Sequence, residues 1–297
     1  MKQLVLIRHG QTHMNELIGG GGINYGGPNF TDVFDDPVER GKYHDSPLSD
    51  AGVRQAQSLN EKLRRLLPSE DACGHDEAEA GSVTAALDAL GLTSNFLDDL
   101  DLIVVSPLTR ALQTMEIAFI DPLITNGGDG DGDRSGRSRI ISAAMPIVAT
   151  PKAAERVYLV SDLGKPRSEL KSLYPFVDFD TAFDNGDGNN DCWHFVPTEE
   201  EEKNYIEWRP SGQGQTYACL GEPQAVFDRR MTELYKWLES RREKCIAVVC
   251  HAGVIDWLTS GDIFSNCELR VISFESLRPR ALLKDDDGGD MKKENVR

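Results

Sequence analysis

The sequence predicts an α/β fold, a three-layer α/β/α sandwich with a mostly parallel central sheet. Three short segments, 3–7, 102–105 and 246–250, are almost continuously apolar. Strands that are apolar at nearly every position are typical of a sheet covered on both faces. Apolar residues recur at helical spacing between these segments, and an alternation of strands and helices indicates this layered architecture.

The expected helices begin at residues that suit a helix N-terminus. Three segments have the helical pattern: 49–67, 107–119 and 226–241. Ser49 can cap the first of them, because a serine hydroxyl accepts from the free backbone N–H groups of the first turn. Pro107 and Pro223 suit the first turns of the other two, because proline lacks the N–H that would be unpaired there.

The chain is expected to form one catalytic domain over residues 1–276, followed by a charged tail at 277–297. Stretches rich in glycine or in acidic residues interrupt the helical and strand patterns, and no internal repeat is present. We interpret these stretches as loop insertions within one domain, near 19–45, 68–98, 126–139 and 184–204.

The composition of the chain argues against some classes of binding partner. The formal net charge of −17 opposes binding to nucleic acid and to anionic membrane surfaces. The six cysteines form no CxxC pair, and the N-terminal apolar run is too short for a secretory leader. We therefore expect a cytoplasmic protein without nucleic-acid or membrane partners, and the sequence does not indicate its oligomeric state. An anionic substrate would need a local cluster of cationic side chains.

Such a cluster is predicted where the apolar strands end. Arg8 and His9 follow the first strand, Arg110 lies one helical turn after Ser106 at the end of the second, and His251 follows the third. Ligands of open α/β sheets bind at the carboxyl ends of the strands, so these side chains should converge. Guanidinium groups pair with phosphoryl oxygens and an imidazole can act as a nucleophile, which indicates phosphoryl transfer.

Four blocks of sequence carry these residues. They are LVLIRHGQTHMN at 4–15, PLSDAGVRQA at 47–56, SPLTRALQT at 106–114 and VVCHAG at 248–253. In this order they resemble the motifs of the histidine phosphatase superfamily, which includes the cofactor-dependent phosphoglycerate mutases. The segment 266–270 is similar to its plant and fungal phosphoglycerate mutase-like branch. The resemblance implies a phosphoglycerate mutase-like fold.

The resemblance also implies a mechanism. His9 would attack phosphorus and become a phosphohistidine, while Arg8, Arg110 and His251 neutralise the charge on the phosphoryl oxygens. A second set of residues would bind the substrate: Thr12, Asn15 and Gly253. Water would then hydrolyse the phosphohistidine. The resemblance implies no metal and no cofactor. We expect a small phosphorylated substrate, with phosphoproteins as the alternative, and the sequence does not identify it further.

The sequence identifies the proton donor to the leaving group less clearly than it identifies the nucleophile. The family places a carboxylate in the region that corresponds to 155–164, and two carboxylates of this chain fall there. Asp162 is the first candidate and Glu155 the second. Three functions stay open at this point: a phosphatase, a mutase that returns the phosphoryl group to its substrate, and a catalytically weak phosphate-binding regulatory module.

Overall fold

The structure has one mixed sheet of five strands at its centre. This computed structural model describes residues 2–20, 37–65, 96–120, 141, 144–183, 191–196 and 221–279. The strands are β1 (Gln3–Arg8), β2 (Leu102–Val105), β3 (Ile147–Ala149), β4 (Cys245–Cys250) and β5 (Leu269–Ser273), in the spatial order β3-β2-β4-β1-β5. Every pairing is parallel except that of β5 with β1. The expected mostly parallel sheet is confirmed.

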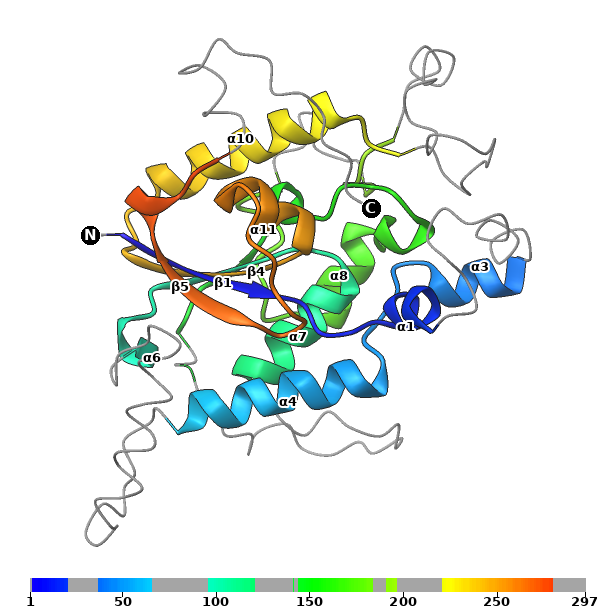
Figure 1. The fold of residues 1–297 in the computed structure, drawn as a ribbon, viewed down its shortest axis with the longest axis horizontal. Coiled ribbons are helices and arrows are strands. Elements are labelled where there is room, and N and C mark those ends of the chain that lie inside the picture. The colour runs from blue at the N-terminus through cyan, green and yellow to red at the C-terminus, as the bar shows by residue number, and fades with distance from the viewer. Residues whose placement is uncertain are drawn as a thin grey trace, which may run out of the picture.

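Helices cover both faces of this sheet (Figure 1). The four main ones are α4 (Asp50–Arg64), α7 (Thr109–Phe119), α10 (Gln224–Ser240) and α11 (Ala252–Thr259). Val5 and Ile7 of β1 belong to the core beneath α4 and α7, whereas Leu4 and Leu6 belong to the core beneath α10 and α11. Successive side chains of a strand point to opposite faces, so burial on both faces explains why the strand is apolar throughout. The three-layer architecture is confirmed.

The predicted helix starts are partly corrected. Ser49 caps α4 as expected, with its hydroxyl accepting from the Gly52 backbone N–H at 3.4 Å. Pro223 occupies the position before the first residue of α10. Helix α7 begins at Thr109 and not at Pro107, because the Asp45 carboxylate accepts from the Thr109 backbone N–H at 2.9 Å and caps the helix from a distant part of the chain.

Further short elements lie between the main ones. They are α1 (His13–Gly19), α3 (Pro37–Tyr43), α6 (Phe96–Asp99), α8 (Arg167–Leu173) and the 3-10 turns Pro151–Ala153, Val160–Asp162 and Phe274–Ser276. Among the helices described, none combines the length and apolar character that a membrane crossing needs. The predicted insertion at 126–139 lies outside the described residues, as do most of those at 68–98 and 184–204 and most of the tail.

Candidate active site

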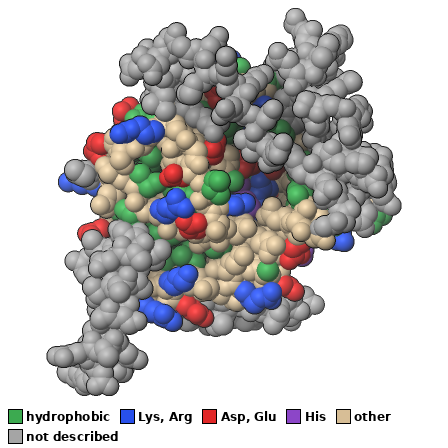
Figure 2. Space-filling view, in the orientation of Figure 1, with side chains coloured by type: hydrophobic (Ala, Val, Ile, Leu, Met, Phe, Trp, Pro, Cys, Tyr) green, Lys and Arg blue, Asp and Glu red, His purple; other side chains and the backbone are tan. Residues whose placement is uncertain are grey.

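A pocket of about 270 Å³ opens at the carboxyl ends of the central strands. In Figure 2, a histidine lies beside Lys or Arg side chains in a recess of the described surface. β1 and β4 run parallel in register, so the residues that follow Arg8 and Cys250 emerge side by side. The rings of His9 and His251 are accordingly 5.0 Å apart between centroids. The predicted convergence of the strand ends is therefore present in the structure.

His9 has the state that a nucleophile needs. Its side chain is 5% exposed, lines the pocket, and places Nδ1 2.7 Å from the Gly10 carbonyl oxygen. A carbonyl oxygen can only accept, so Nδ1 carries the proton and Nε2 keeps a free lone pair. Burial lowers the pKa of His9 well below its ordinary value, and the charges of Arg110 and Arg8 lower it further. The ring is therefore neutral at physiological pH.

Arg8 contributes a buried donor that has no partner in the described part of the chain. Its Nη1 donates to the Phe264 carbonyl at 2.6 Å, which anchors the guanidinium. Its Nε is buried and forms no hydrogen bond with any described residue. An unpaired buried N–H is costly, and an anionic oxygen in the pocket would satisfy it.

Arg110 is held in place on three sides. Its Nη2 pairs with Asp162 Oδ1 at 2.8 Å, its Nη1 donates to the Ser161 carbonyl at 2.6 Å, and its Nε donates to His251 Nδ1 at 3.3 Å. The side chain is 4% exposed and lines the pocket. A guanidinium fixed in this way offers charge to a phosphoryl group with little reorganisation.

His251 lies behind this cationic pair. Its Nε2 is 2.7 Å from the Ser106 hydroxyl and its Nδ1 accepts from Arg110, so both ring nitrogens have protein partners. The ring is fully buried and is not among the residues that line the pocket. Burial and the charge of Arg110 hold its pKa well below the ordinary value. In this structure His251 contacts Arg110, and its predicted contact with the phosphoryl oxygens stays a prediction.

The geometry argues against Asp162 as the proton donor. Besides the Arg110 pair through Oδ1, its Oδ2 accepts from the backbone N–H groups of Tyr158 at 3.0 Å and Leu159 at 2.9 Å. Both Asp162 oxygens are thus engaged by donors of the protein itself, one of them the Arg110 guanidinium. Asp162 therefore holds Arg110 and closes the turn that follows Tyr158, and its predicted role as proton donor stays a prediction.

Glu155 is the better candidate for that role. Its carboxyl lines the pocket and accepts from the backbone N–H of Arg156 at 2.9 Å and of Gly253 at 3.1 Å. Burial raises the pKa of Glu155, and the neighbouring charge of Asp162 raises it further. A Cβ at position 253 would lie 2.3 Å from Glu155 Oε1, so this close approach requires a glycine. Gly253 thus contacts Glu155 and also lines the pocket, and its predicted contact with the substrate stays a prediction.

Thr12 and Asn15 begin helix α1 and line the pocket. The Thr12 hydroxyl accepts from the Asn15 backbone N–H at 3.0 Å, and Asn15 Oδ1 accepts from the Thr12 N–H at 3.1 Å. This reciprocal pair is a capping box, which fixes the turn directly after the nucleophile. Their contact with substrate stays a prediction.

One strand that the sequence analysis overlooked explains why Glu155 was the second candidate. Residues 147–149 form β3, and Glu155 follows its carboxyl end by a short turn. The apolar segment 146–149 could have been identified as a fourth strand, and the rule that located His9 would then have favoured Glu155. Among the described residues, no group of three or more His, Cys, Asp or Glu side chains could hold a metal ion.

The sequence of this chain is similar to those of two plant proteins. No family model matches the chain. A phosphoglycerate mutase-like protein of Arabidopsis thaliana is 29% identical over 201 residues, which are 60% of this chain and 64% of the relative. Phosphoglycerate mutase-like protein 2 of the same plant is 25% identical over 276 residues, which are 73% of this chain and 71% of the relative. The chain thus spans less than two thirds of the first relative's length.

Solved structures with low similarity include two bacterial proteins. A putative alpha-ribazole-5'-P phosphatase from Escherichia coli is 17% identical, with 94% of each chain covered and a TM-score of 0.42. Phosphoglycerate mutase from Thermus thermophilus is 16% identical, with 91% of this chain and 96% of that chain covered and a TM-score of 0.35. The four motif blocks and the two plant relatives support the assignment of this chain to the histidine phosphatase superfamily, in its phosphoglycerate mutase-like branch.

Proposed function

We propose that this protein hydrolyses phosphate monoesters through a phosphohistidine formed on His9. The observation that carries the proposal is the state of His9: neutral, with a free Nε2, beside two guanidinium groups of which one keeps an unpaired buried N–H. An uncharged imidazole next to fixed cations is suited to attack an anionic phosphoryl group.

The reaction has two steps. His9 Nε2 forms a bond to phosphorus while the ester P–O bond breaks, and Glu155 gives its proton to the departing alkoxide oxygen. Arg8 and Arg110 neutralise the charge on the remaining phosphoryl oxygens. Water then attacks the phosphohistidine, the Glu155 carboxylate takes one proton from that water, and inorganic phosphate leaves neutral His9 behind. Both residues return to their starting states.

The walls of the pocket favour hydrolysis over the mutase alternative. Besides the cations, the lining includes apolar side chains and a tyrosine, polar side chains, and two carboxyl groups that would repel a second anionic group of a substrate: Met14, Ile18, Leu159 and Tyr158, then Thr12, Asn15 and Ser161, and lastly Glu155 and Asp162. A phosphoglycerate carries a carboxylate in addition to its phosphate, and buried carboxylates need a cationic partner. Arg8 and Arg110 are the Arg or Lys residues among those that line the described pocket, and the phosphoryl group engages both. An ester with an uncharged organic group fits this lining better.

The test measures phosphate release and labelling of His9 together. Wild-type protein should release phosphate from a panel of small monoesters, and a brief incubation with labelled ester should leave an acid-labile phosphoprotein. His9→Ala should abolish both signals. His13→Ala, which changes an exposed histidine paired with Glu16, should retain both. Phosphate release by the His9→Ala protein would refute the nucleophile, and isomerisation of 3-phosphoglycerate without net hydrolysis would establish the mutase instead.

A further inference from the structure

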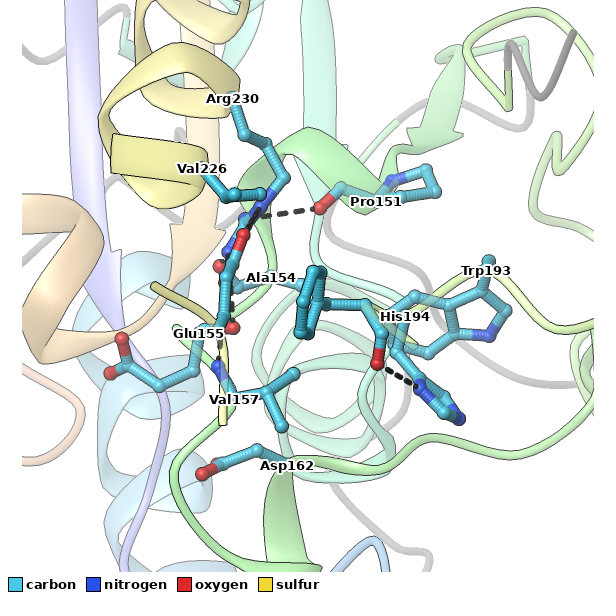
Figure 3. A pocket seen from close by; sticks show the side chains of 11 residues that line it. Pro151, Ala154, Glu155, Val157, Asp162, Trp193, His194, Val226 and Arg230 are labelled. Atoms are coloured by element: carbon cyan, nitrogen blue, oxygen red, sulfur yellow. Dashed lines mark hydrogen bonds and ion pairs between the residues drawn. The ribbon is translucent and has the colours of Figure 1, made fainter. Parts of the chain in front are cut away.

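The backbone that carries Glu155 has little regular structure. Between β3 and the turn at Val160–Asp162 it contains only the single 3-10 turn Pro151–Ala153. A cavity of about 180 Å³ adjoins it, lined in part by Trp193, Phe195 and Val226. Figure 3 shows the Glu155 carboxyl directed away from this cavity. Ala153 and Ala154 pack into the two cores, and on the cavity side the segment is held by polar contacts as well.

Arg230 of α10 supplies these polar contacts. Its guanidinium donates to four backbone carbonyls of the segment: Pro151 at 3.3 Å, Lys152 at 3.1 Å and Ala154 at 2.7 Å through Nη1, and Glu155 at 3.3 Å through Nη2. One side chain thus binds almost the whole turn, as the dashed contacts in Figure 3 indicate in part. A planar guanidinium with five donors can do this, whereas an ammonium group cannot.

Glu222 orients the guanidinium. Its Oε1 accepts from Arg230 Nε at 2.9 Å and its Oε2 from Nη2 at 2.6 Å, and the side chain is 1% exposed. The Glu222 backbone also reaches the segment: its N–H donates to the Val157 carbonyl at 2.8 Å and its carbonyl accepts from Arg156 Nε at 2.7 Å. The residues on both sides of Glu155 are therefore tied to one buried ion pair.

We propose that Arg230 and Glu222 form a positioning pair that holds the Glu155 carboxyl within reach of the leaving-group oxygen. This inference rests on the proposed function, because it assigns a purpose to the acid of that reaction. Neither residue touches the phosphoryl group in this arrangement. A general acid must lie within hydrogen-bond distance of the oxygen that it protonates, and a displacement of about 1 Å can cost about 100-fold in rate.

A positioning role differs from a merely structural one in its dependence on the leaving group. An alkyl phosphate releases an alkoxide that needs a proton, whereas 2,4-dinitrophenyl phosphate releases a stable phenolate that does not. Loss of the acid's position should therefore slow the first substrate and spare the second. General loss of folding would reduce both equally.

The experiment compares kcat/KM for hexyl phosphate and 2,4-dinitrophenyl phosphate in the purified chain of residues 1–297. Arg230→Met removes every donor and keeps an unbranched apolar stem in place of the first four side-chain atoms of arginine. We expect kcat/KM for hexyl phosphate to fall about 10- to 100-fold, against less than about 3-fold for the dinitrophenyl ester. Arg230→Lys should recover little of the lost kcat/KM for hexyl phosphate, because lysine restores the positive charge without the planar set of five N–H donors. Arg241→Met, which breaks the Arg241–Glu243 ion pair beyond the other end of α10, is the matched control and should leave the ratio unchanged.

Two results would overturn the inference. Equal losses on both esters, or no loss on either, would show that the pair does not act through Glu155. If Arg230→Met does not fold, Glu222→Gln carries the same comparison, because it keeps the shape of the side chain and releases the guanidinium. A wild-type protein that hydrolyses neither ester and does not label His9 would refute the proposed function itself, which distinguishes the two failures.

Discussion

Replacing Glu155 by glutamine tests the assignment of the proton donor. The two Glu155 oxygens accept from the backbone N–H groups of Arg156 and Gly253. Glutamine keeps one acceptor oxygen but turns an NH₂ group toward the other N–H, so one hydrogen bond is lost, at about 1 kcal/mol of folding stability. The catalytic cost is larger, because the amide has no proton to give. General acid catalysis contributes about 10²- to 10⁴-fold, or about 3–5 kcal/mol of transition-state free energy.

Glu155 lines an open pocket, which water can enter to protonate part of the leaving group, so we expect the lower part of that range. Glu155→Gln should therefore lower kcat/KM for hexyl phosphate about 10²- to 10³-fold and change that for 2,4-dinitrophenyl phosphate little. Asp162→Asn is the contrasting variant. It removes the negative charge that holds the Arg110 guanidinium in place. Because Arg110 interacts with the phosphoryl group of any substrate, kcat/KM should fall by about the same factor for both esters.

The pH profile adds a second readout. His9 must be neutral, and its pKa is lowered, so activity should rise with pH on a limb below the ordinary value of 6.5. Glu155 must be protonated, and its pKa is raised, so activity should fall with pH on a limb above the ordinary value of 4.5. Glu155→Gln should remove the second limb for the alkyl ester. Retention of that limb, or leaving-group dependence in Asp162→Asn instead, would refute our assignment.

Two further predictions concern stability. Asp45→Ala removes the carboxylate that caps α7 and accepts from the Thr109 N–H and hydroxyl, so it should cost about 1–3 kcal/mol in denaturant unfolding, whereas exposed Asp98→Ala should cost little. His9 and His251 have depressed pKa values, so at these two rings the unfolded chain binds more protons than the folded one below pH 6.5. The melting temperature should therefore fall between pH 7 and pH 5, and a flat profile would show that the two rings are not buried as neutral groups.

Local sequence determined which side chains lie at the active-site edge of the sheet. Arg8 and His9 directly follow an apolar strand, and His251 follows another, so the chain itself brings them to one edge of the sheet once parallel pairing is assumed. The burial of these strands on both faces is encoded in their composition, because each position faces one of two cores. These conclusions needed only the periodicity of side chains along a strand and the direction of the chain.

Other parts of the architecture were decided by contacts between distant segments. β3 is only three residues long, and its pairing with β2 is what makes it a strand. Asp45 sets the start of α7 from outside that helix, so no pattern near Pro107 could have shown it. A cap contributed by another segment leaves no signal in the sequence of the helix that it stabilises.

The choice between the two carboxylates belongs to the tertiary structure alone. Asp162 and Glu155 have the same chemistry and lie seven positions apart, but one pairs with Arg110 and the other meets two backbone N–H groups beside a second negative charge. The free energy of a proton on a carboxyl depends on burial and on neighbouring charges, which are fixed only when the chain has folded. Sequence thus determined which groups could react, and packing gave them the different surroundings on which our proposal of Glu155 as the proton donor rests.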